Sequence, residues 1–208
     1  MNVSAPQRSI APGTEGDVLV ELAAVDVPRS GRQIAERTGR SHVAASRALR
    51  QLAEQGLVIA KSHPPAILYS LNRDHIAAPV VQAMADLRCE LLRRLREHFE
   101  RWSPAPSHAS LFGSTARRDS NEQSDVDLLV IRLDDVDADD PRWEQQLSEI
   151  SDDVYRWTGN HAQIVEFGES EFRGLIDEDH PTIASIRADS VLLAGRRLPA
   201  RSARRRAT

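Results

Sequence analysis

The segment Leu111–Val130 constrains the fold of this chain most, because a glycine–serine pair separates two apolar stretches with the character of β-strands. Gly113 and Ser114 permit a tight turn whose backbone N–H groups can face a phosphate. Asp125 and Asp127 begin the second stretch two residues apart, so the alternation of strand side chains places both on one side. Mg²⁺ prefers such carboxylates together with substrate phosphates. The segment therefore predicts a strand–turn–strand unit that binds a nucleoside triphosphate and a divalent cation.

This motif resembles the nucleotidyltransferase superfamily related to DNA polymerase beta, and within it the minimal nucleotidyltransferase domains of bacteria. The family pattern of a hydrophobic residue, Gly-Ser, a polar loop and Asp-hydrophobic-Asp-hydrophobic is met by Phe112, Gly113, Ser114, Asp125, Val126, Asp127 and Leu128, with Ala116 and Arg117 also in place. The resemblance implies that Asp125 and Asp127 are catalytic and hold Mg²⁺ (or Mn²⁺). It also implies that Gly113, Ser114 and Arg117 bind the nucleotide, and that a nucleoside monophosphate passes to an acceptor hydroxyl. The alternative is an ordinary loop with incidental aspartates.

The family also places a third carboxylate on a neighbouring strand, and here the pattern changes. Aligning the strand His161–Phe167 with the family puts Gln163 where that carboxylate belongs. An amide oxygen is a weak metal ligand and cannot accept a proton. Glu166 lies three residues further on, on the opposite face of a regular strand, and reaches the site only through a bulge or a register shift. Gln163 and Glu166 are the two candidates for the third ligand. The missing carboxylate therefore bears on whether the domain is catalytically active more than on whether it binds a nucleotide.

The front of the chain has the pattern of a helix-turn-helix. Residues 14–24 have helical periodicity with Thr14 as N-cap, and Ser30 caps a second helix, Gly31–Thr38, which stops at Gly39. Ser41 caps a third helix that runs to Gln55, and two short β-runs with a polar, proline-containing tip follow. This order resembles the winged helix-turn-helix of bacterial transcription regulators.

The third helix is the predicted DNA reader, because Ala45, Leu49 and Leu52 fall on one face and are expected in the core. The face left for double-stranded DNA, together with the wing, carries Ser41, His42, Ser46, Arg47, Arg50, Lys61 and His63. So few cations predict weak binding by one copy, and we expect a homodimer on a two-fold site. The alternative is a winged helix that serves only as a protein-interaction module.

A long amphipathic helix is predicted between the two halves. Its apolar positions recur every three or four residues from about 79 to 102, at Val80, Met84, Leu87, Leu91, Leu95, Phe99 and Trp102. The string LNRDH before it resembles the junction in bacterial proteins that fuse a winged helix to a nucleotidyltransferase domain. The helix either couples the domains, pairs with its symmetry mate or packs on its own domain.

The predicted domains are a winged helix-turn-helix over 1–74, the linking helix over 75–102, a nucleotidyltransferase-type domain over 103–195 and a disordered basic tail over 196–208. The fold class is α/β (α+β), and the order of elements in the second domain predicts a mixed sheet with helices on one side.

Charge and composition limit the surroundings of the protein. The net charge of −4 hides an asymmetry, because residues 103–195 carry 7 basic and 20 acidic side chains. The run of aspartates from Asp134 to Asp140 lacks the glycine and the final glutamate of a calcium-binding EF-hand loop and is expected to be solvated. Without a long apolar run or a signal peptide, we expect a soluble, cytoplasmic protein that does not enter a membrane. The lone Cys89 excludes an internal disulfide and is expected to pack on its helix.

Two further interpretations stay open. In one, the domain with Gln163 is catalytically impaired, and the protein is a transcriptional regulator. Bound nucleotide then shifts the DNA-binding dimer between states of different DNA affinity. In the other, a resemblance to minimal nucleotidyltransferases that are paired with small helical toxins implies an antitoxin that binds its own operator and a helical, toxin-like partner protein.

Overall fold

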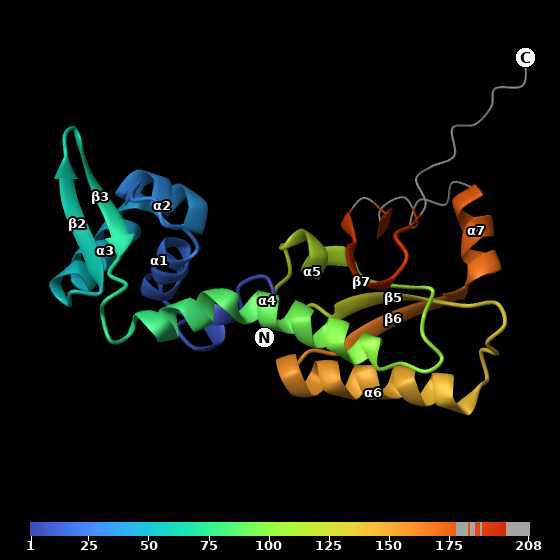
Figure 1. Cartoon of the computed structure of the whole chain (residues 1–208). Helices are drawn as coiled ribbons and strands as arrows, with labels where there is room; N and C mark the ends of the chain where they lie inside the picture. The colour runs from blue at the N-terminus through green and yellow to red at the C-terminus, as the bar shows by residue number, and fades with distance from the viewer. Residues whose placement is uncertain (178–182, 184–185, 188, 199–208) are drawn as a thin grey trace, which may run out of the picture. The chain divides into compact units, whose positions relative to one another are not determined.

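The computed structural model describes residues 1–177, 183, 186–187 and 189–198. The chain divides into two compact units; in Figure 1 one runs from blue to green, and the other runs from green to red except for its first four residues, which are blue. The winged-helix unit is Ala5–Glu90, and the sheet unit is Met1–Ser4 with Leu91–Thr208. Each unit is described by itself. In the described part of the chain, no helix is long and apolar enough to cross a membrane.

The winged-helix unit has the predicted order of elements. Ser30 and Gln33 form a reciprocal capping box at the start of the second helix, and Gly39 ends that helix in the left-handed conformation with φ of 66°. The Ser41 side chain accepts a hydrogen bond from the backbone of Ala44 and so caps the third helix. The elements are η1 (Pro6–Ser9), α1 (Thr14–Ala23), β1 (Arg29–Ser30), α2 (Gly31–Thr38), α3 (His42–Glu54), β2 (Val58–His63) and β3 (Ala66–Leu71).

Local details of this unit differ from the prediction. The N-cap of α1 is Gly13, not Thr14, and no side chain caps that helix. The segment between α1 and α2 includes β1, which was not predicted from the sequence and which adds an antiparallel edge strand to the wing in the order β1-β3-β2. A two-residue strand carries too little sequence pattern to be found before its partner is known.

The sheet unit is built on a mixed four-stranded sheet in the order β6-β5-β4-β7, which confirms the predicted class. β4 pairs antiparallel with β5 and with β7, and β5 pairs parallel with β6. The elements after α4 are β4 (His108–Leu111), α5 (Gly113–Arg117), β5 (Val126–Arg132), α6 (Pro141–Thr158), β6 (Ala162–Gly168), α7 (Glu169–Asp177) and β7 (Val191–Gly195).

The long helix α4 (Ala78–Glu100) contributes to both units and is not a separate linker. Its first half adds Ala78 and Val81 to the core of the winged-helix unit. Its second half adds a buried stripe to the core of the sheet unit: Leu91, Leu95 and Phe99. Val80, predicted in the stripe, is 61% exposed, while Val81 is 3% exposed. Cys89 is exposed and does not pack as expected.

Helices cover both faces of the four-stranded sheet, so the prediction of helices on one side was wrong (Figure 1). On the α6 face, alternate β5 residues such as Leu128 and Val130 pack in one cluster with Trp143, Ile150 and Val154 of α6. On the α7 face, Leu129 and Ile131 pack in another cluster with Phe172 of α7. Within β5, the run Leu128–Ile131 is apolar at every position and buried, as in strands that are covered on both faces.

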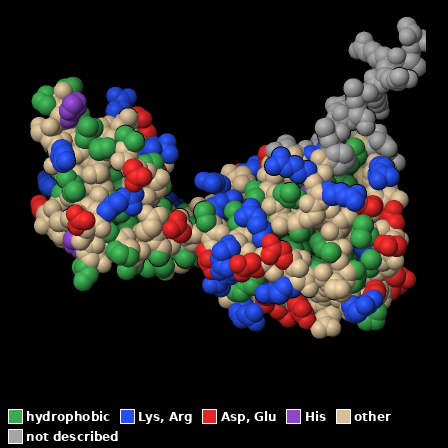
Figure 2. Space-filling model, in the orientation of Figure 1, with side chains coloured by type: hydrophobic (Ala, Val, Ile, Leu, Met, Phe, Trp, Pro, Cys, Tyr) green, Lys and Arg blue, Asp and Glu red, His purple; other side chains and the backbone are tan. Residues whose placement is uncertain are grey.

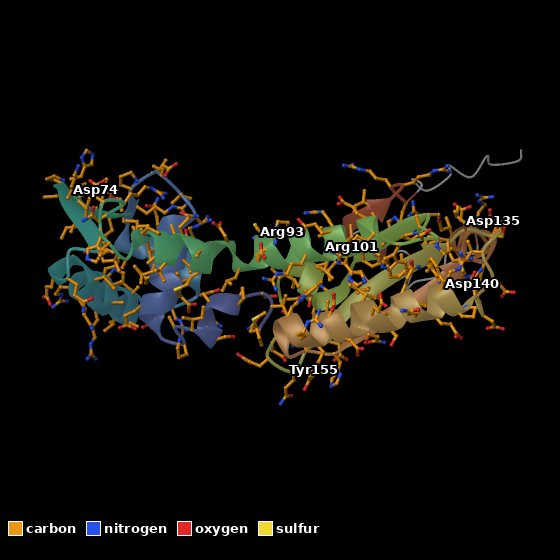
Figure 3. The ribbon with its side chains drawn as sticks, turned by 60° about the horizontal axis from the view of Figure 1, so that its bottom comes forward. Asp74, Arg93, Arg101, Asp135, Asp140 and Tyr155 are labelled. Atoms are coloured by element: carbon orange, nitrogen blue, oxygen red, sulfur yellow. The ribbon has the colours of Figure 1, made fainter. Side chains whose placement is uncertain are left out.

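The end of the predicted tail lies outside the described residues, from 199 onward. The first three residues of the predicted tail, 196–198, are described and continue the sheet unit. The backbone N–H of Arg196 donates to the carbonyl of Ser107 at 2.8 Å, and Leu198 packs on the cluster of the α7 face. The acidic loop has structural partners: Asp140 caps α6, and Asp134 accepts from the backbone N–H of Ser170 at 3.0 Å. Figure 3 shows Asp135 and Asp140 near the first residues of α6 and Tyr155 near its other end.

Candidate functional site

Gly113 and Asp127 form the geometric centre of the candidate site. Gly113 has φ of 67°, in the left-handed region that glycine adopts without strain. A Cβ atom on Gly113 would lie 2.1 Å from Oδ2 of Asp127, so only glycine leaves room for that carboxylate. The backbone N–H of Phe112 also donates to the carbonyl of Asp127 at 3.0 Å. The expected Gly-Ser turn is thus the first residue pair of the short helix α5, and it is built directly against Asp127.

The two aspartates differ in burial. Asp125 precedes β5 and is exposed, whereas Asp127 lies within β5 and is partly buried. Burial and, second, the nearby charge of Asp125 raise the pKa of Asp127, and the Arg117 guanidinium opposes this shift. A bound cation would relieve the repulsion between the partly buried Asp127 carboxylate and that of Asp125.

Arg117 lies at the end of α5, where its guanidinium contacts two carboxylates. Its Nε donates to Asp119 at 3.1 Å, and its Nη1 lies 3.6 Å from a carboxylate oxygen of Asp189. Arg118 adopts a positive φ of 67° at the C-cap of α5 and has no ion pair with any described residue.

Gln163 and Glu166 lie on opposite faces of the sheet. Gln163 is the direct partner of Asp127 in the parallel register of β5 and β6, and its side chain is exposed on the same face. The carboxylate of Glu166 lies on the α6 face, where it accepts from Nε of Arg132 at 3.1 Å and from Nε1 of Trp143 at 2.7 Å. The strand has neither a bulge nor a register shift here, so Glu166 faces away from Asp127.

The carboxylates present fit one divalent cation held with the help of a substrate. No group of three or more histidine, cysteine, aspartate or glutamate side chains in the described ranges is arranged to hold a metal ion. Oxygen ligands from Asp125 and Asp127 match the preference of Mg²⁺ for one or two carboxylates completed by phosphate oxygens and water. The glycine at 113 leaves the Asp127 carboxylate uncovered for such a ligand.

An apolar cavity of about 380 Å³ adjoins Asp127 and Gln163 on the α7 face. We call it the α7-face cavity. Its remaining lining side chains are all hydrocarbon: Phe112, Val165, Phe167, Leu175, Ile183 and Ile186. Sequence reasoning missed this cavity, because its walls come from β6, α7 and the α5 junction, whose contacts are not local.

Two structural contacts near the aspartates were also missed. The Asn160 side chain donates to the carbonyl of Ser124 at 2.8 Å, which fixes the loop immediately before Asp125. Ser120 in the same loop hydrogen-bonds with Ser4, and its backbone N–H donates to the Ser4 hydroxyl at 3.0 Å. Single polar residues of this kind carry no spacing pattern that would identify them.

The candidate DNA surface on the winged-helix unit consists of α3 and the wing. Ala45, Leu49 and Leu52 are 0%, 0% and 5% exposed, as predicted for the core face of α3. Among the predicted DNA residues of α3 and its cap, Ser46 is partly exposed and Ser41, His42, Arg47 and Arg50 are exposed. Lys61 and His63 of β2 are exposed on the wing. Figure 2 shows charged and hydrophobic side chains interspersed on the visible surface of both units.

Ion pairing separates the cations of this unit into two groups. Several arginines are paired with carboxylates inside the unit: Arg8 and Arg40 with Asp17, Arg29 and Arg37 with Glu21, Arg32 with Glu36, and Arg73 with Asp26. Arg47, Arg50 and Lys61 have no ion pair with any residue that the structure describes. The unneutralised charge is therefore on the third helix and the wing.

Asp17 holds the turn before α3 in place. Its side chain is 4% exposed and accepts hydrogen bonds from Gln7, Arg8 and Arg40, the last at 2.8 Å. Burial alone would raise the pKa of Asp17, but these hydrogen bonds together lower it. Arg40 stands in the loop between α2 and α3, so the buried carboxylate fixes where α3 begins.

Two family models match the chain. Residues 12–66 match the MarR family, and residues 89–188 match the nucleotidyltransferase domain. A search among curated protein sequences finds no match.

Solved structures resemble each part. The zinc-responsive MarR family member ZitR of Lactococcus lactis is 26% identical, with 41% of this chain and 61% of ZitR covered and a TM-score of 0.31. Wild-type ZitR in complex with DNA is 23% identical, with 41% of this chain and 60% of ZitR covered and a TM-score of 0.33. A protein of Sulfolobus solfataricus, proposed to be a nucleotidyltransferase, is 20% identical over 53% of this chain and 86% of its own, with a TM-score of 0.33. The chain thus spans about 60% of the length of the ZitR chains that it matches.

Proposed function

We propose that this chain, in which a MarR-type DNA-binding domain is joined to a nucleotidyltransferase domain, is a DNA-associated nucleotidyltransferase. The sheet unit binds a nucleoside triphosphate with Mg²⁺ and transfers the nucleoside monophosphate to an acceptor hydroxyl. The observation that carries this proposal is the packing of Gly113 against Asp127, with Asp125 two residues away, because it combines a glycine-start helix and a carboxylate pair at one point.

Each residue of the site has a distinct role in the proposed reaction. Asp125 and Asp127 hold the metal ion, which supplies positive charge to the triphosphate oxygens. The backbone N–H groups of Gly113 and Ser114, in the turn that starts α5, face the phosphate oxygens of the nucleotide. Arg117 exchanges its contacts with Asp119 and Asp189 for the departing pyrophosphate. The protein contributes position and charge, as phosphoryl transfer requires.

The winged-helix unit binds double-stranded DNA through α3 and the wing. The support is that Arg47, Arg50 and Lys61 are exposed and keep their charge unpaired. Unpaired cations contribute to DNA binding by displacing the counterions of the phosphates. Because one unit offers few of them, we propose that two copies bind together.

A second function is favoured by Gln163. With an amide next to Asp127, the site binds Mg²⁺ and nucleotide but has no group there that accepts the acceptor proton. The chain is then a regulator in which the bound nucleotide changes the affinity for DNA.

The first experiment measures nucleotide binding and pyrophosphate release together. ATP, GTP, CTP and UTP are titrated into the full-length protein with Mg²⁺ in a calorimeter, and pyrophosphate is assayed in the same samples. We expect Asp127→Asn to abolish Mg²⁺-dependent binding. The matched control is Asp135→Asn, an exposed aspartate of the acidic loop, which is expected to bind as the wild type does. Equal binding by Asp127→Asn and the wild type would exclude this site.

The second experiment measures DNA affinity by fluorescence anisotropy on random-sequence duplexes over a range of salt. Arg47→Ala is expected to lower the slope of log affinity against log salt by about 1, the loss of one phosphate contact. The control is Arg32→Ala, since Arg32 is already paired with Glu36 at 3.1 Å. Repeating the titration with saturating nucleotide tests the regulator, because equal affinities would contradict it.

A further inference from the structure

The α7-face cavity adjoins the candidate site and has a strongly uneven distribution of polarity. Its polar lining groups are the carboxylate of Asp127 and the amide of Gln163, which are register partners on adjacent strands. The rest of its described wall is apolar and comes from Phe112, β6, α7 and two isoleucines, Ile183 and Ile186. A ligand that fits such a cavity is apolar over most of its surface and polar at one end.

Cations are absent from the described lining of this cavity. An acceptor with phosphates, such as the end of a nucleic acid strand, would need cations around it. A polycationic acceptor would need several carboxylates, and among the described lining residues Asp127, which would hold the metal ion, is the single carboxylate. The described wall therefore fits an uncharged acceptor.

We propose that the α7-face cavity is the acceptor site of the nucleotidyltransferase reaction, and that its acceptor is a small, uncharged phenol. The inference rests on the proposed function. The hydroxyl lies at the Asp127–Gln163 end and the aromatic ring lies against Phe112, Val165 and Leu175.

The reaction is a displacement at the α-phosphorus. The phenol oxygen forms a new bond to the α-phosphorus, and the bond from that phosphorus to the bridging oxygen of the β-phosphate breaks. Pyrophosphate leaves with the electron pair of that bond, and the hydroxyl proton passes to water. The product is the aryl ester of the nucleoside monophosphate.

Gln163 is the reason for a phenol and not an aliphatic alcohol. A carboxylate at this position would accept the hydroxyl proton, whereas the amide only accepts a hydrogen bond. An acceptor that loses its proton readily compensates for the missing base. The pKa of a phenol is about 10, well below that of water.

The nucleobase of the triphosphate is the competing occupant of the cavity. A base presents several ring nitrogens and exocyclic groups that need hydrogen-bond partners when buried. The described wall offers only the Gln163 amide, at the end next to the metal carboxylates. A phenol needs one polar partner and places it at that end.

The first test is binding and transfer with 4-ethylphenol as the probe. The full-length protein with Mg²⁺ and α-³²P-labelled nucleoside triphosphate is expected to label 4-ethylphenol and release pyrophosphate. Leu175→Asp places a charge in the cavity wall. It is expected to raise the KM for 4-ethylphenol about tenfold and to leave the nucleotide affinity unchanged. The matched control is Ile176→Asp, because Ile176 is the next residue of α7, is similarly half-buried and does not line this cavity.

The second test compares acceptors of different acidity on the wild type and on Gln163→Asp. The wild type is expected to prefer 4-ethylphenol strongly over 2-phenylethanol, which has the same ring and an aliphatic hydroxyl. The new carboxylate is expected to raise transfer to 2-phenylethanol on the order of a hundredfold, and transfer to 4-ethylphenol by much less. An equal gain for both acceptors would overturn the assignment of a phenol.

The outcomes separate this inference from the proposed function. Absence of Mg²⁺-dependent nucleotide binding overturns both. Nucleotide binding without saturable transfer to 4-ethylphenol overturns only the acceptor site, since the metal and nucleotide part of the proposal would stand. Weaker nucleotide binding by Leu175→Asp, with Ile176→Asp unchanged, would assign the cavity to the nucleobase and overturn the inference.

Discussion

The two faces of the four-stranded sheet use the same strands in different ways. On the α6 face, Trp143 and Ile150 are fully buried, and Phe99 of α4 is 1% exposed. On the α7 face, Phe112, Val165 and Phe167 are only partly buried around a cavity of about 380 Å³. One face is closed by tight packing, and the other is open beside the aspartate pair. The difference teaches that a cavity with a partly buried lining, more than residue type, separates the structural side of this sheet from the side available to ligands.

Gln163 and Glu166 show the same difference within one strand. The acidic residue, which has the chemistry of a metal ligand, is engaged on the closed face by Arg132 and Trp143. The neutral residue lies on the open face beside Asp127. From chemical type alone, the acidic Glu166 would be expected beside Asp125 and Asp127, but the neutral Gln163 lies there.

The largest expected effect is on the closed face. Trp143→Ala removes a fully buried indole and is expected to lower the free energy of unfolding by about 3–5 kcal/mol, because the surrounding side chains cannot fill the space. Urea unfolding followed by circular dichroism measures the change. Val165→Ala, on the rim of the α7-face cavity, is the comparison and is expected to cost much less. Equal losses would contradict the contrast between the faces.

A smaller effect is expected from Glu166→Gln. The change removes the charge that Arg132 pairs with at 3.1 Å, and Arg132 is then left largely buried without that partner. We expect a loss of about 1–3 kcal/mol in the free energy of unfolding. Nucleotide affinity, measured by calorimetry, is expected to stay at the wild-type value, whereas a fall in Mg²⁺-dependent affinity would place Glu166 at the metal site after all.

Acid is expected to lower the free energy of unfolding through two buried histidines, one on each face of the sheet. On the α6 face, burial lowers the pKa of His98, although Asp153, at 3.1 Å, acts in the opposite direction. On the α7 face, burial lowers the pKa of His108, whose ring contacts the carbonyl of Arg196 and the hydroxyl of Ser110. Each folded pKa lies below the unfolded value of 6.5, so the unfolded chain takes up the proton first. Stability is therefore complete above that value and falls as the pH drops below it.

The variants His98→Gln and His108→Gln test this acid effect face by face. Urea unfolding at a series of pH values from 7 to 5 is expected to show a shallower fall in stability for each variant than for the wild type. A wild-type slope that neither variant changes would assign the acid effect to other groups.

The smallest expected effect is a gain in stability on the open face. Burial, with the charge of Asp125, raises the pKa of Asp127, so the folded protein holds that proton more tightly than the unfolded chain does. Ionised Asp127 therefore costs stability at neutral pH, and the cost disappears in acid as the carboxyl is protonated. Asp127→Asn is expected to raise the free energy of unfolding at pH 7 by less than about 1 kcal/mol, because water screens the site. A slightly higher melting temperature would show this gain. Unchanged or lower stability at pH 7 without metal would contradict the assigned burial and repulsion.

The sequence by itself determined the features that depend on local spacing. Serine caps, the glycine stop at Gly39 and apolar periodicity specified the helices of the winged-helix unit, since each signal acts within one or two turns. The Asp-x-Asp spacing likewise specified β5, and Gly113 and Ser114 specified a turn, which the structure shows to be the start of the unpredicted helix α5. Alignment with the nucleotidyltransferase family pointed to Gln163, and the parallel register of β5 and β6 places it beside Asp127.

Only the tertiary structure decided which faces were closed and which partners the polar groups found. Asp17 is buried because Arg8 and Arg40, far apart in the sequence, meet on it, and Glu166 is structural because Trp143 of α6 reaches it. The α7-face cavity exists where Phe112, Val165 and Phe167 meet Leu175 of α7 and the buried Ile183 and Ile186 without filling the space between them, whereas α6 and α4 supply the core of the other face. These features depend on contacts between distant segments, and burial and pairing free energies are set by those contacts and not by the spacing of residues along the chain.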